Sequence, residues 1–282
     1  MSTAEFTVLG ASGFLGSALV AHLQKQGRQV RAVRREDGLA LGRPMGHAIY
    51  AIGVTADFRT RPFDTMDAHV AQITRLLREG DFSSLTYLSS TRVYEGNEET
   101  SEDAAISIMP TSPSALYNIS KIAGESICLN AGRANVRVAR LSNVVGVGPG
   151  QDSFLDQLLR EGLAHGALTL RSHPASAKDY IALEDALGLL VAVTERGKAA
   201  IYNIASGEQT SHREVLDVIA AETGWSVAVD ETAARTDFPP INIGRIREEF
   251  GFVPVPFRAY FADHIRNSIK ARNAIEFAKD NK

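Results

Sequence analysis

The chain has 282 residues, a formal net charge of −3 at pH 7, 44% hydrophobic residues and 22% charged residues. These values are those of an ordinary soluble globular protein, and the length suffices for one large or two modest domains. The near-neutral charge gives no basic patch that would indicate a nucleic-acid partner. Cys128 is the only cysteine, which excludes a disulfide framework and a thiolate metal site and favours the reducing cytoplasm.

Metal and membrane classes are also not expected. The seven histidines are scattered, without an HxxxH or HExxH pair, so no metal site is predicted. No charged-then-apolar leader precedes Thr7, and no apolar run approaches a membrane span, so neither a signal peptide nor a membrane partner is predicted.

The first predicted strand, Thr7-Val8-Leu9, continues directly into a glycine-rich turn and an amphipathic helix. Glycines at such a junction allow a tight turn, close approach to a pyrophosphate and close packing of helix on strand, and the helix N-terminus attracts phosphate. The spacing is GxxGxxG and not the general GxGxxG, so a plain tight turn is the alternative. Its position favours a dinucleotide site, formed by Gly10, Ser12, Gly13, Phe14, Leu15 and Gly16.

The second predicted strand, Gln29–Val33, is followed by Arg34 and Arg35. An acidic residue at this point of a dinucleotide fold binds the ribose of NAD, whereas arginine suits the 2′-phosphate of NADP. The pair therefore indicates NADP, with NAD possible; the alternative is two solvated loop arginines.

The following elements continue the alternation of strands and helices. Only a short loop, from Gly38 to Gly46, precedes the third strand, so that crossover is too short for a full helix. We predict strands over 48–52, 85–88 and 137–141 and helices over 66–79 and 114–132. This order favours a Rossmann-type, doubly wound parallel sheet. At strand ends, where such folds bind ligands, lie Ile52, Gly53, Ser90, Thr91 and Asn143.

The pattern changes at the breaker cluster Gly148-Pro149-Gly150. We predict a dinucleotide-binding domain over 1–148, to which 179–206 returns, and a smaller C-terminal α/β substrate lobe over 149–178 and 207–282. The elements predicted beyond the cluster are helices over 153–163, 182–194, 211–223 and 258–277 and strands over 168–170 and 201–204. Ser211 and Glu214 form a capping box for the third of these helices.

Tyr117 and Lys121 are four residues apart, which places them on one face of the predicted helix. A free tyrosine has a pKa of about 10, and a nearby ammonium group and the positive nicotinamide ring would lower it toward the working range. Ser90 could hold a carbonyl or hydroxyl oxygen against the tyrosine while hydride passes between carbon and nicotinamide. The alternative is a helix with a partly buried tyrosine and a surface lysine.

The combined motifs resemble the extended short-chain dehydrogenase/reductase superfamily, in its NAD(P)-dependent epimerase/dehydratase branch that acts on nucleotide sugars. The resemblance covers nearly the whole chain. Its motifs are the glycine loop of residues 10–16, Ser89-Ser90-Thr91-Arg92-Val93-Tyr94, Tyr117-Asn118-Ile119-Ser120-Lys121, Arg140-Leu141-Ser142-Asn143-Val144-Val145-Gly146, Asp179-Tyr180-Ile181 and Tyr202-Asn203-Ile204-Ala205-Ser206-Gly207. It implies a homodimer paired through the helices over 66–79 and 114–132.

The resemblance also implies residue roles. Ser90 would orient the carbonyl with Thr91 sharing its work, Tyr117 would protonate it, and Lys121 would bind the nicotinamide ribose. Asn143 would contact the sugar nucleotide. Three arginines, which suit phosphate geometry, are further substrate-binding candidates, with free surface residues as the alternative: Arg171, Arg235 and Arg245.

Two departures from the family pattern bear on residue roles and on the activity. His69 stands where many relatives have an asparagine, so the structural or catalytic role of that asparagine is not expected here. Thr91-Arg92 replaces the acidic pair of the 4,6-dehydratases, so dehydration is not expected. The sequence favours an NADP-dependent reductase of a nucleotide-activated 4-keto sugar. The alternatives are a sugar-nucleotide epimerase that retains NAD and a non-catalytic dinucleotide sensor.

Overall fold

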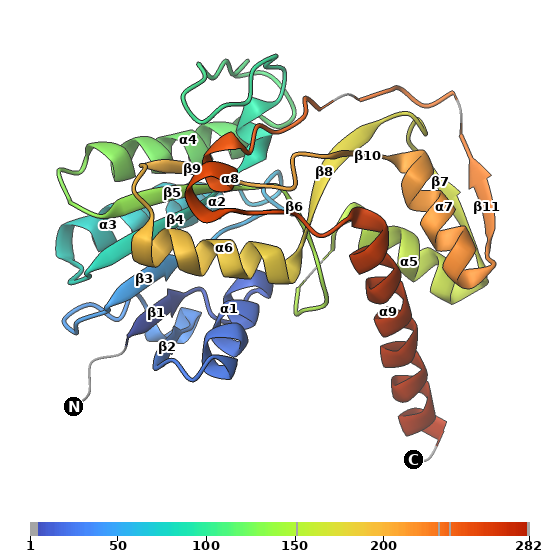
Figure 1. The fold of residues 1–282 in the computed structure, drawn as a ribbon, viewed down its shortest axis with the longest axis horizontal. Coiled ribbons are helices and arrows are strands. Elements are labelled where there is room, and N and C mark those ends of the chain that lie inside the picture. The colour runs from blue at the N-terminus through green and yellow to red at the C-terminus, as the bar shows by residue number, and fades with distance from the viewer. Residues whose placement is uncertain (1–4, 151, 231, 237, 281–282) are drawn as a thin grey trace.

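A computed structural model describes residues 5–280 except 151, 231 and 237, with only the backbone over 273–280. Its centre is a six-stranded sheet in the order β2-β1-β3-β4-β5-β9, with every neighbouring pair parallel (Figure 1). The strands are β1 (Phe6–Leu9), β2 (Val30–Val33), β3 (His47–Tyr50), β4 (Ser84–Ser90), β5 (Val136–Leu141) and β9 (Ile201–Ile204). The predicted Rossmann-type sheet is confirmed. The chain order reverses at β1, and ligands bind at the strand carboxyl ends beside such a point.

Helices cover both faces of this sheet (Figure 1). On one face, α1 (Phe14–Lys25) and α6 (Leu183–Arg196) share an apolar core that includes Leu19, Leu23 and Leu190. On the other face, α3 (Gln72–Glu79) and α4 (Ala115–Asn130) enclose a second core that includes Ile73, Leu76 and Cys128. Burial raises the pKa of the Cys128 thiol, which suits a packing role and not that of a nucleophile.

The crossover from β2 to β3 contains only a short 3₁₀ helix, Arg35–Asp37, as its short loop predicted. The single helix predicted over 66–79 is instead three segments: α2 (Pro62–Met66), a π-helical turn (Asp67–Ala71) and α3. In a π-helical turn the backbone hydrogen bonds differ from those of an α-helix, and two carbonyl groups of this turn accept side-chain hydrogen bonds. The buried hydroxyls of Tyr50 and Tyr87 donate to these carbonyls, at Ala68 (2.6 Å) and His69 (3.1 Å).

A smaller lobe lies beside the main sheet (Figure 1). It has a three-stranded sheet of β10 (Gln209–Ser211), β8 (Ala177–Ala182) and β6 (Asn143–Val145) and a two-stranded sheet of β11 (Ser226–Val229) and β7 (Ala167–Leu170). Helices α5 (Phe154–His165), α7 (His212–Thr223) and α9 (Phe257–Asp280) pack around their own apolar core. The capping box predicted at Ser211 and Glu214 is present, and Ser153 and Asp156 form another before α5.

The C-terminal part of the chain also returns to the main core. Ile241, Ile243 and Ile246, before and within α8 (Gly244–Phe250), are buried with residues of the main sheet. This segment falls within the range assigned to the substrate lobe from sequence, but its apolar side chains belong to the other core. Within the described residues, no helix combines the length and apolarity that crossing a membrane requires.

Candidate active site

The glycine loop lies where β1 meets α1, and two of its glycines are required by space. Gly10 has φ of +85°, and a Cβ there would lie 2.8 Å from the carbonyl carbon of Ala51. A Cβ on Gly16 would lie 2.1 Å from the Gly10 oxygen. No described side chain caps α1 at Gly13, which leaves first-turn N–H groups to bind an anion. The loop therefore fits a dinucleotide pyrophosphate.

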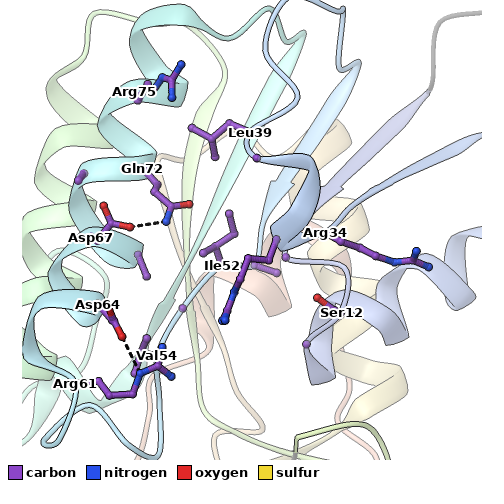
Figure 2. Close-up of a pocket in the computed structure, with 18 residues that line it drawn as sticks. Ser12, Arg34, Leu39, Ile52, Val54, Arg61, Asp64, Asp67, Gln72 and Arg75 are labelled. Atoms are coloured by element: carbon purple, nitrogen blue, oxygen red, sulfur yellow. Dashed lines mark hydrogen bonds and ion pairs between the residues drawn. The ribbon is translucent and has the colours of Figure 1, made fainter.

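A cavity of about 730 Å³ extends from this loop along the ends of β1, β2 and β3. Figure 2 shows Ser12 and Arg34 on one wall and the side chains of α2, the π-helical turn and α3 on the facing wall. On that facing wall, Arg61 pairs with Asp64 at 2.9 Å. Arg34 and Arg35 both line the cavity, and no carboxylate of the described residues pairs with either guanidinium. Two unneutralised guanidinium groups suit a phosphate.

A second cavity, of about 550 Å³, joins the glycine loop to the remaining catalytic candidates. Its lining comes from α1, β4, α4, β5 and β6 and from the loops that follow β1, β3, β4 and β6. Most of the predicted site residues meet here: Ser12, Gly13, Phe14, Leu15, Gly16, Ile52, Gly53, Ser90, Tyr117, Lys121 and Asn143.

Tyr117 is 5% exposed and burial raises the pKa of its phenol, whereas the Ser90 hydroxyl and the Arg92 guanidinium act to lower it. Burial of the phenol is the largest contribution to its pKa, and it acts against the lowering expected from Lys121, whose Nζ lies 5.9 Å from the Tyr117 ring centroid, and from a bound nicotinamide ring. That lowering stays a prediction.

Lys121 is 5% exposed, and its Nζ donates to the Leu88 carbonyl oxygen at 2.9 Å. Burial lowers its pKa to about 7, and the Glu125 carboxylate acts in the opposite direction. A Cβ placed on Gly53 would lie 3.5 Å from this nitrogen and 3.2 Å from Nε2 of His69. A side chain at residue 53 would thus crowd both groups. Because Gly53 has none, the space between the end of β3 and Lys121 stays open and is suited to a ribose.

His69 is fully buried beneath this space. Its Nε2 accepts the backbone N–H of Val54 at 3.1 Å, and its Nδ1 lies 2.8 Å from Ser120 Oγ. Burial and the nearby Lys121 lower the pKa of the imidazole to about 2. The residue that departs from the family pattern therefore joins the β3 exit loop to α4 as a neutral group.

A third cavity, of about 650 Å³, lies between the main sheet and the small lobe, and its lining includes Thr91, Asn143 and Arg171. Thr91 Oγ1 donates to the Leu141 carbonyl at 3.3 Å, and Asn143 Nδ2 donates to the Asp179 carbonyl at 2.8 Å. Arg171 is exposed and pairs with Glu161 at 2.7 Å.

The other two candidate arginines lie elsewhere. Arg235 is exposed and does not line the cavities described here. Arg245 pairs with Asp103 at 2.6 Å and donates to the Ile201 carbonyl at 2.8 Å, because α8 packs against β9. Its guanidinium is engaged away from the cavities.

Most residues of the third cavity were not named as site candidates from the sequence, and four of them bear on binding. Arg92 and Lys178 bring charge, and Phe154 and His212 stack with ring centroids 4.5 Å apart. Only Arg92 carried a signal, because it follows the hydroxyl cluster directly. The others come from the small lobe, and their residue types are common on ordinary surfaces.

Comparison with known proteins identifies the family. The model of the NAD dependent epimerase/dehydratase family matches residues 6–205. The chain belongs to this family. The resemblance inferred from the motifs is thereby confirmed, together with an enzymatic function and a nicotinamide dinucleotide as the cofactor class.

Two curated proteins and one solved structure are similar to this family member. The dTDP-6-deoxy-L-talose 4-dehydrogenase (NAD(P)(+)) of Kitasatospora kifunensis is 24% identical, over 89% of this chain and 91% of its own. The GDP-6-deoxy-D-mannose reductase of Pseudomonas aeruginosa is 32% identical, over 51% of this chain and 50% of its own. The structure of MoeE5 in complex with UDP-glucose and NAD has a TM-score of 0.78 at 22% identity, covering 95% of this chain and 99% of that one.

Proposed function

We propose that this protein is an NADP-dependent reductase that reduces a keto group of a nucleotide-activated sugar. The observation that carries the proposal is the single cavity in which the glycine loop, Ser90, Tyr117 and Lys121 meet. A nicotinamide cofactor supplies hydride when bound. Similarity to a nucleotide-sugar reductase and a nucleotide-sugar dehydrogenase supports the same reaction class.

A protonated Tyr117 suits the role of proton donor that a reduction requires. Because burial raises the pKa of the phenol, the hydroxyl is protonated at neutral pH and can give its proton to the oxygen of a ketone. The Ser90 hydroxyl would hold that oxygen, and the Lys121 ammonium would bind the ribose.

The choice of NADP rests on Arg34 and Arg35. Both line the adenosine end of the first cavity without a carboxylate partner among the described residues. Asp37 is not well placed to bind the ribose of NAD, because its Oδ2 already accepts the backbone N–H of Arg34 at 2.9 Å. A 2′-phosphate would neutralise the two guanidinium groups.

The third cavity would take the nucleotide part of the substrate between the main domain and the substrate lobe. Lys178 supplies a cation for a phosphate, and the stacked Phe154 and His212 supply flat apolar surface. Asn143 lies between this cavity and that of Tyr117 and would contact the substrate at their junction. Binding of UDP-glucose by the structurally similar MoeE5 supports a nucleotide sugar here.

The assembly and compartment belong to the same proposal. Phe63 on α2 is 87% exposed, and Met66 and Ile119 present further apolar surface on α2 and α4. These side chains would be covered in a homodimer that pairs through α2 and α4. We expect this dimer to act in the cytoplasm. Light scattering of the purified protein tests the dimer, and a monomer at micromolar concentration would contradict it.

The reaction is tested by NADPH oxidation with a panel of nucleotide-linked keto sugars, followed by the absorbance of the reduced nicotinamide. We expect turnover by the wild type and a loss of about 100-fold or more in Tyr117→Phe. Tyr180→Phe is a matched control, because Tyr180 is also buried but lies in the core of the small lobe. Full activity of Tyr117→Phe would remove the tyrosine as proton donor, and NAD retained through purification would favour an epimerase.

A further inference from the structure

Arg92 is a cation fixed beside the catalytic tyrosine. It follows β4 in a 3₁₀ helix, and its guanidinium lies 4.8 Å from the ring centroid of Tyr117 and 5.5 Å from that of Phe58. One terminal nitrogen donates to Ser114 Oγ at 3.1 Å, and the backbone N–H donates to Ser90 Oγ at 3.2 Å. The side chain lines both the Tyr117 cavity and the third cavity. Its charge therefore faces the space where a reacting sugar would lie.

No described carboxylate forms a direct ion pair with this guanidinium; that of Glu95 is linked to it only through Ser114 Oγ, which donates to Glu95 Oε1 at 3.4 Å. The acidic groups of the third cavity are engaged elsewhere: Asp179 accepts the N–H groups of Ser206 and Gly207, Glu161 pairs with Arg171, and Asp152 pairs with Arg160. A half-buried cation without a counter-charge is costly unless a ligand supplies one. The missing charge is thus expected from the substrate.

Lys178 is a second cation in the same space, and its position differs. Its Nζ lies 5.4 Å from the Phe154 ring, next to the Phe154–His212 stack, on the side of the small lobe. Burial lowers the pKa of Lys178, and the nearness of Arg92 lowers it further, as expected for two like charges that face one cavity. Lys178 is placed for the phosphates of a nucleotide, whereas Arg92 is placed for a group on the sugar.

We infer that the sugar carries a carboxylate next to the reacting carbon, as in a hexuronate-type nucleotide sugar, and that Arg92 binds it. Guanidinium and carboxylate form a charge-assisted pair, and a neutral hydroxymethyl group at the same place would leave the guanidinium unpaired. The inference rests on the proposed function, because it takes the sugar to lie against Tyr117. It makes Arg92 the residue that selects between acidic and neutral sugars.

The test measures binding of matched nucleotide sugars that differ in one group. Calorimetric titrations use UDP-glucuronic acid against UDP-glucose and GDP-mannuronic acid against GDP-mannose, on the full-length protein with NADP bound. We expect the wild type to bind the uronate of at least one pair tenfold or more tightly than its neutral partner. Arg92→Gln, which keeps a donor for Ser114, should abolish that preference while changing the affinity for the neutral sugar less than threefold.

Lys178→Met is the matched control, because it removes another cation of the cavity and leaves Arg92, Arg59 and Arg171 in place. It should weaken both members of a pair alike and leave their ratio unchanged. Equal affinities in the wild type, or a preference that survives in Arg92→Gln, would overturn the carboxylate inference and leave the proposed reductase standing. If no pair binds at all, the proposed nucleotide-sugar function fails, and the inference fails with it.

Discussion

The Nδ1 atom of His69 and the Oγ atom of Ser120 lie 2.8 Å apart in the buried space under Lys121. Ser120 Oγ donates its proton to the Tyr117 carbonyl at 2.8 Å, so the hydrogen of the histidine contact must come from Nδ1. Nε2 then keeps its lone pair for the Val54 N–H. The network fixes one neutral tautomer, which joins the loop after β3 to the helix that carries Tyr117 and Lys121.

Replacing His69 should loosen that loop. His69→Gln can satisfy only one of the two partners, so we expect NADPH to bind about fivefold more weakly, from the loss of about 1 kcal/mol in one buried hydrogen bond. Because the pKa of His69 is lowered to about 2, the imidazole stays neutral at working pH, and the shape of the pH–rate profile should not change. Fluorescence titration with NADPH and a pH series measure the two effects. A shifted profile would show that His69 titrates during turnover.

Replacing Arg34 and Arg35 with alanine should weaken NADPH binding by about tenfold or more and leave NADH binding unchanged, since only NADPH has the 2′-phosphate. Arg75→Ala is a matched control, because Arg75 lines the facing wall and pairs with Glu79 at 3.2 Å. Equilibrium titration with both cofactors makes the measurement. An equal loss for NADH and NADPH would contradict recognition of the 2′-phosphate.

Lys121 should make stability depend on pH. Its pKa is about 7 in the folded chain against 10.5 as the ordinary value, so the unfolded chain binds more protons between these values. The free energy of unfolding therefore rises as the pH rises from about 7 toward 10.5. Lys121→Met removes the buried ammonium and should stabilise the protein at pH 7, by on the order of 2 kcal/mol. This advantage should shrink at higher pH.

Urea unfolding at several pH values measures this prediction. Lys198→Met is its control, because Lys198 is exposed and should leave the pH dependence as in the wild type. A Lys121→Met protein that is less stable than the wild type at pH 7 would show that the bond to the Leu88 carbonyl outweighs the cost of burying the ammonium.

The buried ion pair of Arg140 and Glu125 should contribute several kcal/mol to the free energy of unfolding, in the sense that breaking it on one side is costly. The two charges meet at 2.6 Å with side chains 4% and 3% exposed, and Ser89 Oγ donates to the same carboxylate at 2.5 Å. Arg140→Met leaves that carboxylate buried without its cation, and we expect a cost of about 3–5 kcal/mol. Adding Glu125→Met should recover most of this loss. Chemical unfolding of the two single variants and the double variant forms the cycle, and additive effects would contradict the pairing.

Features with local causes could be predicted from the amino-acid sequence alone. The glycine loop was identifiable because Gly10 and Gly16 meet backbone that lies close along the chain or on the adjacent strand. Tyr117 and Lys121 share a face through helical spacing, and the alternation of strands and helices predicted the parallel sheet. The Ser211 capping box was likewise contained in four consecutive residues.

Features that depend on partners far apart in the chain could be seen only in the folded protein. Strands β6 and β10, of three residues each, exist because β8 lies between them, and such short segments have no periodicity of their own. The π-helical turn depends on two tyrosines from other strands. The raised pKa of Tyr117 and the unneutralised charge of Arg92 follow from burial and from which carboxylates are already engaged. Residue spacing cannot specify the pKa of Tyr117 or the missing counter-charge of Arg92. Both depend on which groups the folded chain shields from water and on which carboxylates it pairs with other cations.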